Sequence, residues 1–289
     1  MSRGSATPWL LVAPTQLLLL GVIGLPSLYV MWLALTQSSY GQAPVWVGLQ
    51  NYRTVLADPY FWRALWNTLI VVNVVVYGEL VLAMGIAVLF AGGVPLRRAM
   101  IAVVLAPYAV SEVVAVMVWR YLMEPDIGPI THALEALGLP GLDWSVSPVA
   151  ALGLVGIINV WMHLPFTFIL LYTGLLAIPA ELYEAARIDG ASPWTEFRRI
   201  TLPVLMPSIL VAVLFRIIFA FRMFSEVWLL TQGGPARSTE VVALYLYLTG
   251  FRYGDFGGAA AIGVLMLLGS LLLSVFWLRR AYRGMFAHA

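Results

Sequence analysis

The segment Pro179–Pro203 reads PAELYEAARIDGASPWTEFRRITLP, and it decides how the whole chain is interpreted. It contains seven charged residues, in a chain that has only 16 basic and 14 acidic residues. On each side it is flanked by an apolar run long enough to cross a bilayer as a helix. A polar segment between two such runs indicates a structured loop that joins two membrane spans.

The same segment predicts two short helices joined by a hinge. Pro179 suits the first position of a helix, where its missing N–H has no intrahelical partner. Gly190 predicts the stop, because glycine enters the left-handed C-cap conformation without steric cost. Ser192 can then cap a second helix with Pro193 at its first position. Pro203 is expected to end that second helix.

The first of these helices has two interpretations. Leu182, Ala185 and Ala186 fall on one face, and the small alanines would let the backbone of another protein approach closely. This pattern is typical of a docking element. An amphipathic helix that lies on the membrane surface has the same pattern. The residues alone leave both interpretations open.

Composition places the chain in a membrane. Of its 289 residues 62% are hydrophobic and 10% are charged, with a mean hydropathy of +0.91, whereas soluble domains have about 25% charged residues. The net charge of +2 gives no reason to expect a nucleic-acid partner. The chain has no cysteine, which excludes disulfides and thiolate metal sites, and no metal site is predicted. It also has no lysine, so it cannot supply the P-loop lysine that binds nucleotide phosphates.

The apolar runs predict an all-α integral membrane protein with six transmembrane helices. The first run is too long for a signal peptide, and no A-x-A site follows it, so we expect an uncleaved span. Pro107 predicts a kink in the third span, and a short helix closed by Gly138 is expected near residues 131–137. The expected spans cover approximately residues 9–35, 66–90, 100–121, 148–178, 204–230 and 259–278.

The distribution of arginine predicts the orientation. One set of termini and loops contains nine arginines, namely Arg3, Arg97, Arg98, Arg187, Arg198, Arg199, Arg279, Arg280 and Arg283. The opposite set contains five, namely Arg53, Arg63, Arg120, Arg237 and Arg252. The positive-inside rule assigns the first set to the cytoplasm. Both termini and the hinge segment are therefore expected on the cytoplasmic side.

Several ionisable and amide side chains fall within the expected spans, where charge is costly and usually faces a bundle interior or a water-filled path. Arg222 and Glu226 are four residues apart and could form an ion pair on one helix. Such a pair could fix the packing of the spans or line a solute path, and both interpretations stay open. Arg216 could reach Glu79 or Glu112 across the bundle. The candidate path residues are Asn73, Asn159, His163, Arg216, Arg222 and Glu226.

Other classes of function receive less support. The chain contains no H-E-x-x-H or G-x-S-x-G motif, so an intramembrane hydrolase would lack a metal site or a nucleophile. The chief alternative is a stand-alone secondary transporter that uses Glu79, Glu112 or Glu226 as its proton site. No convincing internal repeat supports that alternative.

A family resemblance narrows these choices. Glu184-Ala185-Ala186, then three residues and Gly190, then nine residues and Ile200-Thr201-Leu202-Pro203, resembles the EAA loop of permease subunits of binding-protein-dependent ABC importers. Trp161–Phe166 and Leu230–Pro235 are similar to the sugar-permease branch, which contains maltose- and glycerol-phosphate-type permeases. The resemblance covers approximately residues 5–285 and implies the MetI-like fold.

The resemblance also implies roles and partners. The hinge segment would be the coupling helix that contacts an ATPase, through Glu184, Ala185, Ala186, Asp189, Gly190, Ile200, Leu202 and Pro203. The implied partners are a second permease, two ATPase subunits that bind ATP and Mg²⁺, an extracytoplasmic solute-binding protein and membrane lipid. The chain itself would bind no cofactor and catalyse no reaction.

The implied location is the bacterial inner membrane. We expect an N-terminal span and outer loop at 1–62, the transport domain at 63–283 with its coupling loop at about 179–203, and a cytoplasmic tail at 284–289. In one place the sequence departs from the family pattern. Permeases of this branch often have Asn and Asp late in span five, where this chain has Arg222 and Ser225. An added cation suits an anionic sugar derivative, because the arginine fork matches carboxylate, phosphate or sulfonate oxygens.

Overall fold

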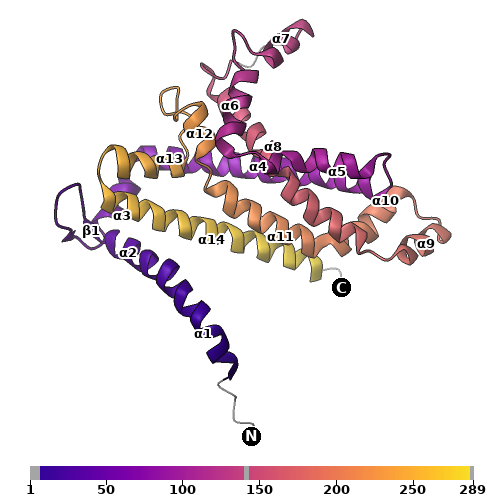
Figure 1. Ribbon diagram of the computed structural model, residues 1–289, viewed down its shortest axis with the longest axis horizontal. Helices are drawn as coiled ribbons and strands as arrows, with labels where there is room; N and C mark the ends of the chain where they lie inside the picture. The colour runs from indigo at the N-terminus through magenta and orange to yellow at the C-terminus, as the bar shows by residue number, and fades with distance from the viewer. Residues whose placement is uncertain (1–6, 140–142, 287–289) are drawn as a thin grey trace. The chain divides into compact units, whose positions relative to one another are not determined.

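The computed structural model describes residues 7–139 and 143–286, and the described chain is almost entirely helical (Figure 1). This confirms the predicted all-α class. The only strands among these residues are β1 (Thr36–Gln37) and β2 (Val45–Trp46), which pair antiparallel with Thr36 opposite Trp46. Arg3, which was used to predict the orientation, and residues 287–289 of the expected cytoplasmic tail lie outside the described residues.

Helices are distributed over both halves of the described chain. The first half contains α1 (Thr7–Leu19), the π-turn η1 (Leu20–Gly24), α2 (Leu25–Leu33), α3 (Gln50–Ala57), α4 (Pro59–Ala91), α5 (Arg97–Leu105), the 3₁₀ turn η2 (Ala106–Ala109), α6 (Glu112–Leu122) and α7 (Pro129–Ala136). The second half contains α8 (Pro148–Leu176), α9 (Ala180–Ile188), α10 (Pro193–Glu196), the π-turn η3 (Phe197–Thr201), α11 (Leu202–Phe221), α12 (Ser225–Leu230), α13 (Val242–Tyr247), the π-turn η4 (Leu248–Arg252) and α14 (Phe256–Phe286).

Five of the described helical segments are long and apolar enough to cross a membrane. They are Leu11–Leu33, Pro59–Ala91, Pro148–Leu176, Pro193–Phe221 and Phe256–Arg279. A sixth candidate consists of Arg97–Ala109 followed by Glu112–Leu122, two helices at 102° to each other. The six predicted spans therefore correspond to five continuous helices and one sharply bent pair.

The third span is broken, and the prediction of a single kinked helix is wrong in this respect. Pro107 has no N–H to donate, and the helix narrows there into the 3₁₀ turn η2. Val110 is then extended, with φ −89° and ψ 136°. Ser111 starts a new helix, because its side-chain oxygen accepts a hydrogen bond from the N–H of Val114 at 3.4 Å.

The fifth span begins earlier and ends earlier than residues 204–230. Pro203 does not end the second short helix, because the chain continues from α10 through the π-turn η3 into α11. The wider π-turn accommodates the proline ring, which then occupies the first turn of α11. At the other end α11 stops at Phe221, and α12 starts again at Ser225.

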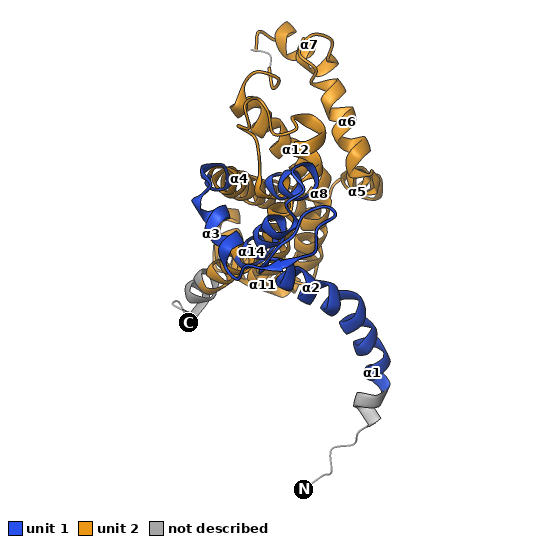
Figure 2. Ribbon diagram, turned by 90° about the vertical axis from the view of Figure 1, so that its left-hand side faces the viewer, with its two compact units in different colours: residues 1–62, 245–268 blue, residues 63–244, 269–289 orange. Residues whose placement is uncertain are grey.

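The chain divides into two compact units, coloured separately in Figure 2. Unit 1 comprises residues 7–62 and 245–268, and unit 2 comprises the remaining described residues. Within unit 1, the outer loop that was expected after the first span contains the strand pair and α3. The Asn51 side chain ties them to the end of the first span by donating to the backbone oxygens of Ala34 at 2.9 Å and Thr36 at 2.8 Å.

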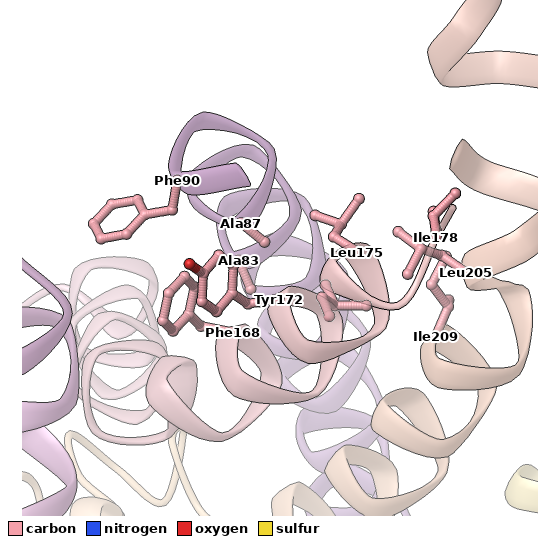
Figure 3. Packing of buried hydrophobic residues seen from close by; sticks show 10 residues of the cluster. Ala83, Ala87, Phe90, Phe168, Tyr172, Leu175, Ile178, Leu205 and Ile209 are labelled. Atoms are coloured by element: carbon pink, nitrogen blue, oxygen red, sulfur yellow. The ribbon is translucent and has the colours of Figure 1, made fainter. Parts of the chain in front are cut away.

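Unit 2 is built on an apolar core between α4, α8 and α11 (Figure 3). Small residues of α4, Ala83 and Ala87, lie in this core beside larger residues of α8. Phe168 and Tyr172 of α8 stack with their ring centroids 5.2 Å apart. Leu205 of α11 is 1% exposed and contributes the third side of this core. Side chains of three spans thus interlock at this end of unit 2.

A buried ion pair and a hydrogen bond to it join the same three helices at another place along their length. Arg216 of α11 is 1% exposed and Glu79 of α4 is fully buried. The Arg216 Nε donates to Glu79 Oε2 at 2.7 Å, and the Thr167 hydroxyl of α8 donates to Glu79 Oε1 at 2.5 Å. This confirms that Arg216 has a partner across the bundle and identifies it as Glu79. Glu112, the other expected partner, accepts a hydrogen bond from Ser225 instead.

We expect the protein to be destabilised when either partner of the buried ion pair is removed alone. Removing one partner of a buried pair typically costs about 3–5 kcal/mol, because the other charge is left uncompensated. Glu79→Leu and Arg216→Met should each lower the thermal unfolding midpoint of the detergent-solubilised protein. The double variant should unfold at a higher temperature than either single variant. Additive losses in the double variant would show that the two charges do not stabilise each other.

Candidate functional site

The hinge segment adopts the two short helices that its sequence predicts. Helix α9 begins at Ala180, one position later than expected, and Pro179 is its N-cap. Gly190 has a φ of +78°, and the chain turns there because glycine has no side chain to clash in this conformation. The Ser192 side chain caps α10 by accepting from the N–H of Thr195 at 3.3 Å. Helix α9 lies beyond the end of α8 (Figure 1).

The residues expected to contact an ATPase divide into two groups. Glu184, Ala185, Asp189 and Gly190 are exposed, and Ala186 is half-buried on the same helix. Ile200 and Leu202 instead pack against the apolar core of unit 2, and Pro203 is exposed next to them. The first group can reach another protein. Ile200 and Leu202 anchor the segment to the spans.

Two polar contacts cross the hinge, and neither was predicted from the sequence. The Arg187 guanidinium donates to both carboxylate oxygens of Glu196, at 2.9 and 3.4 Å. The hydroxyls of Tyr183 and Thr201 lie 2.9 Å apart and share a hydrogen bond. The hydrogen bond to Glu196 and the charge of Glu196 raise the pKa of Arg187 above its usual value. The sequence signal that could have predicted the ion pair is that Arg187 and Glu196 have opposite charges and lie nine residues apart, on either side of Gly190.

A cavity of 580 Å³ opens in unit 2 where the third span bends and the fifth span breaks. Its acidic and basic lining residues are Glu112 of α6, His163 of α8, Glu226 of α12, and Arg222 at the C-cap of α11. Aromatic rings from Tyr108, Phe219 and Phe224 also line it. The cavity therefore offers charge of both signs and several ring faces to a bound molecule.

One wall of the cavity is held by a chain of hydrogen bonds that leads back to the buried ion pair. The Asn159 amide nitrogen donates to Glu226 Oε1 at 2.6 Å. The Asn159 amide oxygen accepts from Arg216 Nη2 at 2.8 Å. Asn159 and Glu226 are 2% and 3% exposed, and both line the cavity. Arg216 is not among the lining residues, and its hydrogen bond to this wall is the one to Asn159.

The expected ion pair between Arg222 and Glu226 is not formed. Side chains four residues apart meet only on a continuous helix, and the helix is interrupted between Phe221 and Ser225. Glu226 bonds to Asn159 instead. Within the described part of the chain, no carboxylate lies within ion-pair distance of Arg222, which is exposed in the cavity.

The six candidate path residues thus occupy three different places. Asn159, His163, Arg222 and Glu226 line the cavity, and Arg216 lies behind it. Asn73 lies elsewhere on α4 and donates its amide to the backbone oxygen of Leu69 at 2.7 Å. The sequence reasoning missed a further set of lining residues that includes Tyr108, Ser111 and Phe224. Pro107 was the only signal for the bend that brings Tyr108 and Ser111 to the cavity.

Comparisons with known proteins agree with this architecture. Residues 4–285 match the family described as "Binding-protein-dependent transport system inner membrane component". The sulfoquinovosyl glycerol transport permease SmoG of Agrobacterium fabrum is 32% identical over 277 residues, which cover 93% of this chain and 88% of SmoG. The trehalose/maltose transport permease MalF of Thermococcus litoralis is 33% identical over 278 residues, which cover 96% of this chain and 94% of MalF.

Solved structures show the same fold. A chain of a bacterial alginate ABC transporter, in complex with an alginate pentasaccharide-bound periplasmic protein, superposes with a TM-score of 0.82 at 22% identity and covers 96% of this chain and 95% of its own length. A second structure is of a bacterial ABC transporter involved in the import of the acidic polysaccharide alginate. It superposes with a TM-score of 0.79 at 25% identity and covers 95% of this chain and 96% of its own length.

These findings do not favour the stand-alone proton-coupled transporter, because the matched relatives are permease proteins of multi-component transport systems. A membrane location agrees with the six candidate spans. The family match covers nearly the whole chain rather than one motif. The chain belongs to the inner-membrane permease family of binding-protein-dependent transport systems.

Proposed function

We propose that the chain is one permease subunit of an ATP-driven importer for a carbohydrate, and that the cavity of unit 2 is its half of the solute path. The observation that carries this proposal is the composition of the cavity wall. Its 580 Å³ fall within the usual range of about 300–1,000 Å³ for small-molecule sites. Rings such as Tyr108 and Phe219 suit the apolar faces of sugars, and Asn159 and Glu226 suit their hydroxyl groups.

The solute of this importer carries negative charge, and Arg222 binds it. Arg222 projects into the cavity without a carboxylate partner in the described structure, so its five donors are available to a ligand. An arginine fork matches the oxygens of carboxylate or sulfonate groups. The names of two relatives point the same way, since sulfoquinovosyl glycerol bears a sulfonate and alginate is an acidic polysaccharide.

Energy for transport comes from a separate ATPase dimer that binds ATP and Mg²⁺. The absence of lysine from the chain supports this division, because a P-loop needs a lysine on the phosphates. A second permease completes the path, and an extracytoplasmic binding protein delivers the solute. The relative solved with a periplasmic binding protein supports such a partner.

The transport domain covers residues 63–283, and both termini lie in the cytoplasm of a bacterial cell. The arginine distribution supports this orientation through the positive-inside rule. It exposes Glu184, Asp189 and Gly190 of the hinge segment to a cytoplasmic ATPase. Closure of the ATPase dimer on ATP moves the docked segment, and the spans then change the side to which the cavity opens.

Glu184 is expected to be required for coupling, because it is the exposed carboxylate of the EAA sequence. Hydrogen bonds to charged groups contribute about 1.5–3 kcal/mol, so Glu184→Ala should reduce ATP-dependent uptake about tenfold or more. Uptake is measured in proteoliposomes with the complete transporter. Glu181→Ala removes another exposed carboxylate from the same helix and serves as the control. Uptake by the Glu184 variant at the control rate would exclude this contact.

Arg222→Gln is expected to change selectivity rather than to abolish transport. The KM for an acidic disaccharide with a uronate group should rise about 10- to 100-fold, because a charge-assisted contact of about 1.5–3 kcal/mol is lost. The KM for the corresponding neutral disaccharide should stay the same. Arg63→Gln, at an exposed arginine outside the cavity, is the charge-matched control. An equal effect on both sugars would refute an anion-binding role for Arg222.

A further inference from the structure

The coupling segment contains a π-turn where an ordinary α-helix would be expected, and this turn has a geometric effect. The π-turn η3 spans Phe197–Thr201, and the N–H of Leu202 bonds to the oxygen of Phe197, five residues back. In an α-helix, residues five apart lie about 140° apart around the axis. In a π-turn they are close to one full turn apart, because the hydrogen bond joins residue i to residue i+5. Glu196 and Thr201 therefore lie on one face.

Helix α9 presents a matching pair of side chains. Tyr183 and Arg187 are four residues apart and lie on one face of α9. Arg187 binds Glu196 through two hydrogen bonds, and Tyr183 binds Thr201 at 2.9 Å. Glu196 and Thr201 are 9% and 5% exposed, so the side of the segment that receives these two contacts is packed. The two contacts are in register only because of the π-turn.

The receiving side is also continuous with a span. From η3 the chain passes without a break into α11, and Ile200 and Leu202 pack against the apolar core. Helix α11 contains Arg216, and Arg222 follows directly at its C-cap. A displacement of α9 is thus applied to the same helix that bears the buried ion pair and ends at the cavity.

We propose that Tyr183, Arg187, Glu196 and Thr201 form a two-point clamp, registered by the π-turn η3, that makes α9 and the start of α11 move as one body. This inference rests on the proposed function and assigns these four residues a positioning role. Gly190 allows the chain to turn between α9 and α10, and a single contact would leave α9 free to rotate about that contact. Two contacts one helical turn apart remove this rotation.

The test compares transport with ATP hydrolysis in the complete transporter, reconstituted in proteoliposomes. Tyr183→Phe with Glu196→Met removes the tyrosine hydroxyl and both carboxylate acceptors, and it keeps the side-chain volumes close to those of the parent. The amount of solute imported per ATP hydrolysed should fall at least fivefold, while the ATPase rate and the thermal unfolding midpoint stay close to those of the parent. Glu181→Gln with Arg198→Gln is the control, because both residues are exposed on the same segment and lie outside the clamp.

A charge reversal provides the rescue. Arg187→Glu alone places two carboxylates together and should lower the import per ATP, and adding Glu196→Arg should restore it at least in part. An import per ATP within twofold of the parent in the Tyr183→Phe, Glu196→Met variant would overturn the clamp. A parent complex that shows no ATP-dependent uptake would overturn the proposed function and the clamp together.

Discussion

A guanidinium buried in an apolar helix bundle needs an acidic partner on another helix, and this requirement organises unit 2. Transferring an unpaired charge into the interior costs several kcal/mol, so Arg216 of α11 and Glu79 of α4 restrict how these two spans can pack. Thr167 adds α8 through a hydrogen bond to the same carboxylate. Asn159 then extends the network from Arg216 to Glu226 in the cavity wall. The residues that fix the packing thus also hold one side of the cavity that we propose as the solute path.

The features that could be predicted from the sequence are those set by local chemistry. Gly190 ends α9 because only glycine adopts its left-handed conformation without cost, and Ser192 caps α10 because its hydroxyl accepts from a nearby N–H. The spans follow from apolar runs of sufficient length. The partner of Arg216 could be restricted to two glutamates, because few acidic residues lie at that depth. Its identity needed the structure.

The features that could not be predicted depend on tertiary contacts. The ion pair expected between Arg222 and Glu226 assumed a continuous helix, and no residue between Phe221 and Ser225 is a proline or glycine that would signal a break. The π-turn η3 likewise has no signature in the local sequence, and because of it the helix continues beyond Pro203. Motif spacing also placed Ile200 among the ATPase contacts, whereas its side chain packs against the spans. Motif membership therefore did not distinguish contact residues from anchoring residues.

The breaks in the third and fifth spans support the proposed solute path by an argument that does not depend on charge. In a bilayer, irregular backbone is tolerated only where it is buried in protein or lines a water-filled cavity, because lipid cannot hydrogen-bond its polar groups. The third span is irregular at Val110 and Ser111, and the fifth at Arg222–Phe224. All of these residues line the same 580 Å³ cavity. Two separate spans lose regular helical structure at one cavity, and this supports our proposal that a polar solute crosses the membrane there.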